Sequence, residues 1–377
     1  MRRTLPVATL LAAAALAACA DTPTDARRAP GSAPAAAASE NAPIYLVTFN
    51  DGVTDVRGAA NAIAHGNGLA LRHVREHAAR GFSAVIPAAR LDLVRSDPRV
   101  KLVEKDGPVQ LIAPVHVQAK PGGGGGVQST PWGITRVGGA GDGTGKTAWI
   151  LDTGVDLANA DLNTSKACHT YFAGNSPSDG NGHGTHVAGT IAARNNAIDV
   201  VGVAAGAYVC SVRVLGNSGS GSWEGIVNGV NFVASRGGNG DVANMSLGGS
   251  GSNATLENAI RDAAARGIKF VLSAGNSGAN TANYTPARLN ASNVYTISAI
   301  DSNGCMPSWS NWGNPPVDYA APGVSVVSLR RGGGTTSMSG TSMAAPHVAG
   351  ILLLGSVRAD GSATCDRDGN PDPIAHR

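Results

Sequence analysis

Along residues 129–357, short runs of apolar residues alternate with longer stretches in which apolar residues recur every three or four positions. The short runs fit buried strands, and the longer stretches fit helices with one buried face. We expect strands over residues 147–151, 209–215, 242–245 and 269–272, and helices over residues 183–193, 223–236, 253–266 and 341–357. This alternation builds a parallel sheet with helices on both faces. The pattern therefore predicts a three-layer α/β domain with a central parallel sheet.

Residues 42–112 carry a shorter pattern of their own. We expect strands over residues 44–49, 69–74, 81–86 and 100–104, and helices over residues 56–66 and 91–97. These elements predict a small α+β domain of about 70 residues, which is a size that is only marginally stable by itself.

The first 19 residues are typical of an export leader. Two arginines follow Met1, and the apolar stretch over residues 5–18 is too short to span a bilayer. Residues 16–19 also resemble a bacterial lipoprotein box, in which Cys19 carries a lipid and becomes the new N-terminus. We favour lipidation of Cys19, and an ordinary Ala-x-Ala cleavage with an incidental cysteine stays open. Either reading predicts an exported protein, secreted or held at the cell envelope.

Two further segments are typical of linkers. Residues 20–41 are rich in Ala, Pro, Thr and Ser, and residues 121–126 are a proline followed by five glycines. Such sequences cannot hold a fixed backbone cheaply. We therefore expect a tether at 20–41, a processing linker at 113–128 and a C-terminal tail at 358–377 around the two domains.

Charge and cysteine content bear on partners and compartment. The net charge is only +3, and no basic cluster interleaves with aromatic residues, so we expect no nucleic-acid binding. Besides Cys19 there are four cysteines, an even number that favours two disulfides in an exported chain. We favour Cys168–Cys210 and Cys305–Cys365 because the members of each pair are close in sequence. Other pairings and free thiols stay open.

Four polar residues stand at the ends of expected elements. Asp152 ends an apolar strand, His183 stands between glycines at a helix start, Asn276 follows a strand, and Ser342 begins an apolar helix. In parallel α/β sheets, functional groups gather beyond the carboxyl ends of the strands. Taken singly, each residue has a plain alternative as a turn or cap residue. Together they predict one site at the same edge of the sheet.

Ser342 is expected in the first turn of its helix. Pro346 should cost little there, because the first backbone donors of a helix have no partner within it. Those donors favour negative charge beside Ser342. In the chain order Asp, His, Ser, the motifs around Asp152, His183 and Ser342 resemble those of the subtilisin-like serine proteases. Residues 130–137 resemble the mature start of the proteinase K branch.

The resemblance implies a secreted serine endopeptidase of the three-layer subtilisin-like fold, acting on polypeptides as a monomer. Asp152 would orient His183, His183 would act as base, Ser342 would attack, and Asn276 would donate to the oxyanion. No redox cofactor or catalytic metal is then needed. His186 would be structural, and we reject a metal pair with His183 because no Glu occupies the zincin position and no third ligand follows.

The resemblance also implies that the substrate backbone binds between two edge segments, which any sequence can do. A pocket would hold the residue before the scissile bond. Its glycine and alanine walls leave space, and no acidic residue offers a counter-ion, so we expect broad specificity with an apolar preference. The expected residues are Gly219, Ser220, Gly221, Ser246, Leu247, Gly248, Ser273, Ala274 and Gly275.

By the same resemblance, residues 42–112 would be an inhibitory propeptide that the enzyme cuts away. A lipid on Cys19 would then stay with the inhibitor, so that any membrane attachment ends with processing. Asp318 falls where proteinase K-like enzymes keep a structural calcium carboxylate, and a solvated loop aspartate is the alternative. Asp366, Asp368, Asn370 and Asp372 also alternate like oxygen ligands, although a polar tail explains them equally well.

The chain departs from the family pattern near its end. Only about 35 residues follow Ser342, fewer than the family usually has, so we expect a covering helix to be missing or replaced by the tail around Cys365. The stretch between Trp132 and Asp152 is also short. A self-cleaving exported module and a dedicated processing protease or peptide ligase stay open as alternatives to a general protease.

Overall fold

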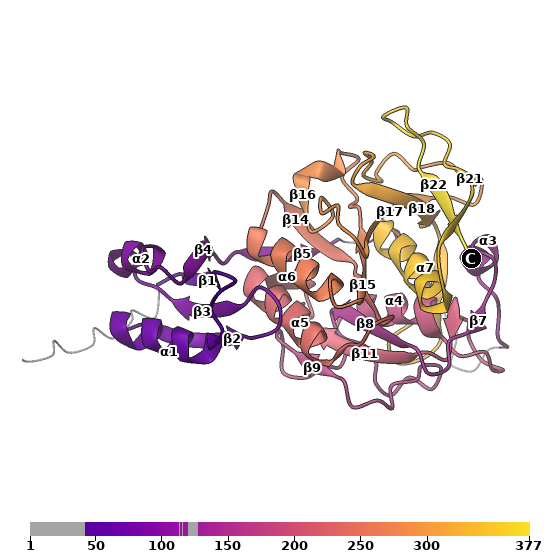
Figure 1. Ribbon diagram of the computed structural model, residues 1–377. Helices are drawn as coiled ribbons and strands as arrows, with labels where there is room; N and C mark the ends of the chain where they lie inside the picture. The colour runs from indigo at the N-terminus through magenta and orange to yellow at the C-terminus, as the bar shows by residue number, and fades with distance from the viewer. Residues whose placement is uncertain (1–41, 113, 115, 120–126) are drawn as a thin grey trace, which may run out of the picture. The chain divides into compact units, whose positions relative to one another are not determined.

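The computed structural model describes residues 42–112, 114, 116–119 and 127–377, and its largest element is a nine-stranded sheet (Figure 1). Neighbouring strands run parallel except at one edge, where β21 pairs antiparallel with β22. Across the sheet the order is β21 (Arg358–Ser362), β22 (Pro373–His376), β18 (Val317–Pro322), β17 (Val294–Ile300), β15 (Lys269–Ser273), β13 (Val242–Met245), β8 (Thr147–Asp152), β11 (Tyr208–Arg213) and β9 (Thr170–Tyr171).

The sheet is buried on both faces, as strand β8 shows. Ala148 and Ile150 belong to one hydrophobic core, while Trp149 and Leu151 belong to another. The first core also holds α4 (His183–Ala192) and α7 (Thr341–Leu354), and the second holds α5 (Trp223–Arg236) and α6 (Ala254–Ala264). The three-layer α/β fold is therefore confirmed. Short elements complete this part: α3 (Trp132–Arg136), β7 (Gly141–Asp142), β10 (Ala204–Ala205) and a 3₁₀ turn (Thr281–Asn283).

The N-terminal segment forms a four-stranded antiparallel sheet in the order β2, β3, β1, β4. Its own core includes Val47, Ile63 and Phe82. One helix begins earlier than expected, at Ala88, because the two alanines after Pro87 extend it beyond its apolar positions. The elements are β1 (Ile44–Phe49), α1 (Val56–Asn67), β2 (Ala70–Arg75), β3 (Gly81–Val85), α2 (Ala88–Arg95) and β4 (Val100–Lys105).

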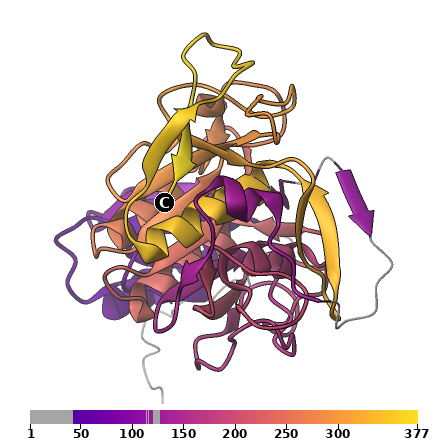
Figure 2. The same ribbon diagram turned by 90° about the vertical axis from the view of Figure 1, so that its right-hand side faces the viewer.

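Two small sheets carry the chain onward from this domain. Strand β5 (Pro108–Leu111) lies between β12 (Ser220–Ser222) and β14 (Leu247–Ser250), and β14 also pairs with β16 (Tyr284–Thr285). Strand β6 (His116–Ala119) adds to the hairpin of β19 (Val326–Leu329) and β20 (Thr335–Ser339), as Figure 2 shows. Most of the expected linker at 113–128 lies outside the described residues, as do the leader, the tether and Cys19.

The C-terminal tail is part of the main sheet. Helix α7 ends at Leu354 rather than at residue 357, and the chain then turns into the hairpin of β21 and β22. Strand β22 pairs with β18, so the tail covers the sheet edge where a helix was thought to be missing. Within the described part of the chain, no helix is both long enough and apolar enough to cross a membrane.

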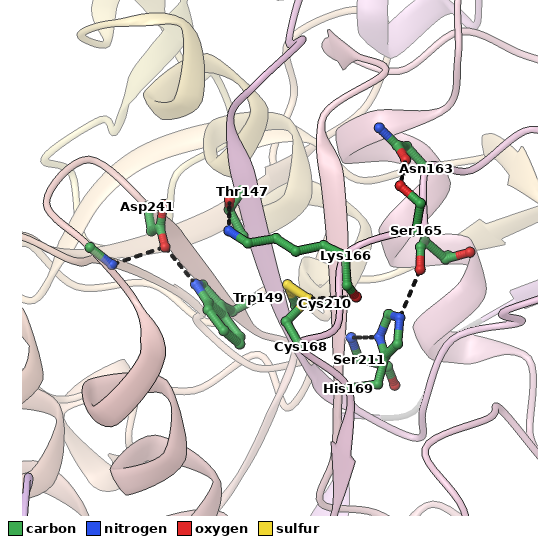
Figure 3. The surroundings of a disulfide bond; sticks show 12 residues. Thr147, Trp149, Asn163, Ser165, Lys166, Cys168, His169, Cys210, Ser211 and Asp241 are labelled. Carbon is green, nitrogen blue, oxygen red and sulfur yellow. Dashed lines mark hydrogen bonds between the residues drawn. A yellow bond between two sulfur atoms is a disulfide. The ribbon is translucent and has the colours of Figure 1, made fainter.

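Two disulfides link segments that are distant in the chain. Cys168, just before β9, bonds to Cys210 on β11 (Figure 3). Cys305, in the loop after β17, bonds to Cys365 in the tail. These are the two pairs expected from the sequence. The first lies beside Lys166, whose Nζ donates to Thr147 Oγ1 at 2.8 Å.

Candidate active site

The centre of the site is a buried pair of Asp152 and His183. Asp152 ends β8 and His183 begins α4, and their side chains are 0% and 1% exposed. With its proton on Nδ1, His183 donates to Asp152 Oδ1 at 2.8 Å and lies 3.0 Å from Oδ2. The backbone N–H of Thr153 also donates to Oδ1, at 2.7 Å. The carboxylate therefore fixes the tautomer in which Nε2 is a base, and among the described residues that buried Nε2 has no hydrogen-bond partner.

Ser342 lies in the first turn of α7 and faces the end of β5. Its Oγ donates to the carbonyl oxygen of Ile112 at 3.0 Å and lies 3.4 Å from that of Ser246. Ser342 is completely buried. The peptide bond that follows Ile112 is therefore presented to the hydroxyl by a segment 230 positions away in sequence.

Pro346 lies at a position of α7 where a backbone N–H would normally make a helical hydrogen bond. It is the sixth residue of α7, beyond the orphan donors of the first turn, so the carbonyl of Ser342 loses its helical partner. Ser246 supplies the replacement, because its Oγ donates to Ser342 O at 3.0 Å. The expectation about Pro346 was wrong in its reason, and the compensating bond ties Ser246 to the nucleophile.

Asn276 follows β15, and α7 holds its side chain by the oxygen. Asn276 Oδ1 accepts from the N–H of Thr341 at 2.9 Å and from Thr341 Oγ1 at 2.9 Å. Thr341 Oγ1 in turn accepts from the N–H of Gly275 at 3.0 Å. An amide fixed through its oxygen has its Nδ2 donors directed to the opposite side. Asn276 is thus held against the first residue of α7, where the resemblance places the oxyanion donor.

The expected binding segments hold an extended chain in this structure. On one side Val109 and Gln110 pair with Gly221 and Ser220, and the N–H of Leu111 donates to Gly219 O at 2.7 Å. On the other side the same strand pairs with Leu247 and Gly248. The structure thus brings five of the expected residues together around a bound segment of backbone.

A cavity of about 300 Å³ adjoins the end of that segment. Ala274, Gly275 and Asn276 form part of its lining, and Leu111 and Ile112 reach into it. Further lining residues, Gly249, Ser250, Ser277, Tyr284, Thr285 and Ala287, were not expected from sequence. They come from β14, β16 and adjoining turns, which meet only in the folded chain.

Two of the expected pocket residues, Ser246 and Ser273, do not line the cavity. Ser246 directs its hydroxyl to the carbonyl of Ser342, and Ser273 directs its hydroxyl to the carbonyl of Met245 at 3.5 Å. Both serines are buried. Their role is structural because each hydroxyl makes a hydrogen bond within the protein, and no local sequence pattern indicates which way they point.

Asp318 lies on β18 rather than in a solvated loop. Its Oδ2 accepts from the N–H of Thr296 at 2.8 Å, and burial raises the pKa of Asp318 to about 6. In the described residues, no three His, Cys, Asp or Glu side chains converge as a metal site. A cation at Asp318 would therefore have to draw on backbone oxygens.

A second buried carboxylate was missed from sequence. Asp161 is completely buried, and its Oδ2 has no hydrogen-bond partner among the described atoms. Burial raises its pKa to about 6. Asn196 Nδ2 donates to its Oδ1 at 2.7 Å, and Gln128 Nε2 lies within 3.4 Å of the oxygens of Arg194, Asn196 and Val200. The amide groups of Gln128 and Asn196 thus donate to these oxygens, and Asp161 Oδ2 is left as a buried acceptor.

His186 lies one turn after His183 and is completely buried. Its Nε2 lies 3.1 Å from the carbonyl oxygen of Val326, and burial lowers its pKa to about 3. The ring therefore stays neutral. His186 belongs to the packing of α4 against β19, in keeping with a structural role.

Comparisons with known proteins agree with this geometry. A family model described as the subtilase family matches residues 143–360. Alkaline serine exoprotease A of Vibrio alginolyticus is 39% identical over 299 residues, which are 76% of this chain and 53% of that protein. M-protease of Shouchella clausii is 41% identical over 270 residues, which are 70% of this chain and 66% of that protein. The chain thus spans only about half to two thirds of these relatives.

A solved structure of a cold-adapted subtilisin-like serine proteinase superposes with a TM-score of 0.57 at 35% identity. The superposition covers 65% of this chain and 97% of the solved chain. The matched region contains Asp152, His183, Asn276 and Ser342 within the family model's range. The chain belongs to the subtilase family.

Proposed function

We propose that this protein is a secreted serine endopeptidase that hydrolyses peptide bonds of polypeptides. The observation that carries the proposal is the approach of Ser342 Oγ to 3.0 Å from the carbonyl oxygen of Ile112. The buried pair of His183 and Asp152 supplies an oriented base at the start of α4, which shares a hydrophobic core with α7. Family membership supports the same chemistry. A bound peptide carbonyl, a nucleophile and an oriented base are the parts that acyl transfer needs.

The reaction proceeds through an acyl-enzyme. His183 Nε2 takes the proton of Ser342 Oγ as the oxygen attacks the carbonyl carbon, and Asp152 stabilises the imidazolium. The oxyanion accepts hydrogen bonds from Asn276 Nδ2 and from the N–H of Ser342. His183 then gives its proton to the leaving amine, and the C–N bond breaks. Water, activated by the same imidazole, releases the acyl group and restores the serine.

The first substrate is the chain itself, cut between Ile112 and Ala113. Residues 42–112 then form the inhibitor, with β5 still lying between β12 and β14. This separated propeptide makes further contacts: Glu104 accepts from the N–H groups of Ala254 and Thr255 at 3.0 and 2.7 Å. A lipid on Cys19, where present, leaves with the propeptide. Mass spectrometry of mature enzyme that still begins at Cys19 would refute the last step.

Broad specificity with an apolar preference follows from the pocket. Leu111 and Ile112 form part of its lining, and none of its lining side chains is charged. Strand pairing through backbone atoms adds no demand for particular side chains. A general protease of this kind acts as a monomer on unfolded or extended segments.

Subtilisins need no cofactor for catalysis, but a structural calcium ion suits this chain. The carboxylate of Asp161 suits such an ion better than that of Asp318, because the buried Oδ2 of Asp161 has no hydrogen-bond partner among the described atoms, whereas Asp318 Oδ2 accepts from the N–H of Thr296. Calcium would neutralise the buried charge of Asp161 there and hold the mature N-terminal segment to α4.

The test is casein hydrolysis and N-terminal sequencing of wild type and Ser342→Ala. We expect wild type to degrade casein and to start after Ile112 or at a trimmed position further on. Ser342→Ala should stay as full-length precursor, with activity about a millionfold lower. Maturation without casein hydrolysis would instead favour a self-cleaving module or a dedicated processing protease. Casein hydrolysis by Ser342→Ala would refute the proposal.

A further inference from the structure

The last loop of the chain has oxygen ligands on alternate positions. Between the disulfide at Cys365 and strand β22 stand Asp366, Asp368, Asn370 and Asp372. The N–H groups of Asp368 and Asp372 donate to the two carboxylate oxygens of Asp366, at 3.3 and 3.2 Å. The loop therefore closes on itself, with its first and last aspartates together.

The last of these aspartates is buried without enough partners. Asp372 is 0% exposed, and its Oδ2 accepts from Ser298 Oγ on β17. Its Oδ1 has no hydrogen-bond partner among the described residues, and neither has the buried Oδ1 of Asn314. The Asn314 side chain lies beside the Asp372 carboxylate, and its Nδ2 donates to Asn370 O at 3.0 Å. Two acceptors without hydrogen-bond partners among the described residues thus come from neighbouring segments, the turn before β18 and the last loop of the chain.

No described basic side chain neutralises this loop. Arg367 turns away and its Nη1 lies 3.3 Å from the carbonyl oxygen of Gly278. In the described part of the chain, Asp366, Asp368 and Asp372 take part in no ion pair. Burial and the charges of Asp366 and Asp368 raise the pKa of Asp372 to about 6. Buried acceptors that carry charge call for a positive partner, because a buried charge without one is strongly unfavourable.

We propose that this loop binds a calcium ion through the carboxylates of Asp366 and Asp372 and the amide oxygen of Asn314. Calcium accepts six to eight oxygens in flexible geometry, so loop carbonyls and water complete the set. Asp368 already accepts from the N–H of Asn370 at 2.8 Å, and no three acidic side chains of the described chain converge here. The amide and carbonyl oxygens are for that reason part of the site.

The ion would act on the edge of the main sheet. Its ligands join the tail to the turn before β18, while Asp372 immediately precedes β22, which pairs with β18. Calcium bound there would hold the tail against β18, at the edge of the main sheet. This site is separate from Asp161 and from Asp318, and it does not depend on catalytic activity.

The test uses full-length Ser342→Ala, which cannot digest itself, stripped of metal and titrated with calcium by calorimetry. Asp372→Asn and Asn314→Leu, each added to it, should lose one calcium ion per chain or bind it at least tenfold more weakly. Asp360→Asn is the matched control, since Asp360 lies on the same tail but pairs with Arg136 at 3.0 Å. It should leave the number of ions unchanged.

Terbium luminescence gives a second reading of the same site. Trp312 is two residues from Asn314, so a terbium ion there should be sensitised by excitation of tryptophan, and calcium should displace it. Asp372→Asn should abolish that signal. Unchanged calcium stoichiometry and affinity in both Asp372→Asn and Asn314→Leu would overturn the proposal. The proposal would also be overturned if Asp372→Asn made the metal-free protein more stable without any loss of bound calcium. That result would show that Asp372 is a buried, protonated side chain and not a calcium ligand.

Discussion

Single hydrogen bonds decide how the oxyanion donor is aimed. Thr341 holds Asn276 Oδ1 with both its N–H and its hydroxyl, and the same hydroxyl receives the N–H of Gly275. Asn276 is therefore prepared before a substrate arrives. A donor that needs no reorganisation at the moment of reaction contributes most to stabilising the transition state.

Replacing Thr341 with valine should lower kcat about tenfold with little change in KM. The substitution removes one hydrogen bond, which is worth about 1–1.5 kcal/mol, and 1.36 kcal/mol is tenfold in rate. Thr341→Ser keeps the hydroxyl and serves as the control. Steady-state kinetics on a soluble peptide substrate give the measurement, and a loss expressed mainly in KM would contradict this role.

At the same scale, sequence predicted Asp152, His183, Asn276 and Ser342 because each sits in a local motif at the end of an element. The bond from Ser246 to the carbonyl freed by Pro346 could not be predicted. It joins positions 96 apart, and nothing local indicates which way a buried serine points. Asp161 was missed for the same reason, since its partner Asn196 lies 35 positions away in sequence.

Among the elements, strand β4 and the residue directly after it place two carboxylates, Glu104 and Asp106, at the starts of helices α6 and α5. Glu104 accepts from the N–H groups at the start of α6, and Asp106 accepts from the N–H of Glu224 at the start of α5, at 2.9 Å. Carboxylates at helix N-termini satisfy orphan donors and match the helix dipole. These caps add affinity beyond the strand pairing of β5.

Glu104→Ala should weaken inhibition by the separated propeptide about 10- to 100-fold, because it removes charge-assisted hydrogen bonds worth about 1.5–3 kcal/mol. The inhibition constant of purified propeptide against mature enzyme is the measurement. Asp92→Ala is the control, since Asp92 is 95% exposed on α2. Equal inhibition by both variants would exclude the cap as a source of affinity.

The propeptide should also bind more weakly in acid. Burial alone would raise the pKa of Glu224, but hydrogen bonds from His73, Arg72 and Ser83 of the propeptide region lower it from 4.5 to about 2. A group whose pKa is lower in the complex stabilises the complex above the free value and loses that effect as pH falls. Affinity should therefore drop between about pH 4.5 and pH 2, by at most tenfold per unit.

Fluorescence anisotropy of labelled propeptide with mature enzyme carrying Ser342→Ala measures this without catalysis. Glu224→Gln cannot ionise, so its affinity should be lower at neutral pH and should change less between pH 5 and pH 3. A wild-type affinity that rises on acidification would contradict the assigned direction.

The longer helices and the strands with strong apolar periodicity were predicted, and their ends moved by a few residues, whereas β17 and β18 of the main sheet were not predicted. The hairpin of β21 and β22 was not predicted. All five residues of β21 are exposed, so the strand has no alternation of buried and exposed positions to reveal it. Only its pairing with β22 keeps it extended, and that pairing depends on the folded sheet.

For the molecule as a whole, the tail is held by Cys305–Cys365, which closes a loop of 60 residues. Cys365→Ser should lower the free energy of unfolding by about 2–4 kcal/mol, as expected for a loop of that size. The half-life of activity on heating in the absence of reductant is the measurement. Loss of Cys168–Cys210 by Cys168→Ser provides the comparison, and an unchanged half-life for Cys365→Ser would show that β22 holds without it.

The carbonyl of Ile112 reaches Ser342 within the same chain, and this has a kinetic consequence. The self-cleavage proposed at that bond would be a first-order reaction, so dilution should leave its rate unchanged. After the cut, the propeptide is a separate molecule, and its hold on the enzyme weakens with dilution because the effective concentration given by the tether is gone. Each freed enzyme can then destroy the propeptides of its neighbours, so activity in a concentrated preparation should appear after a lag and then rise steeply.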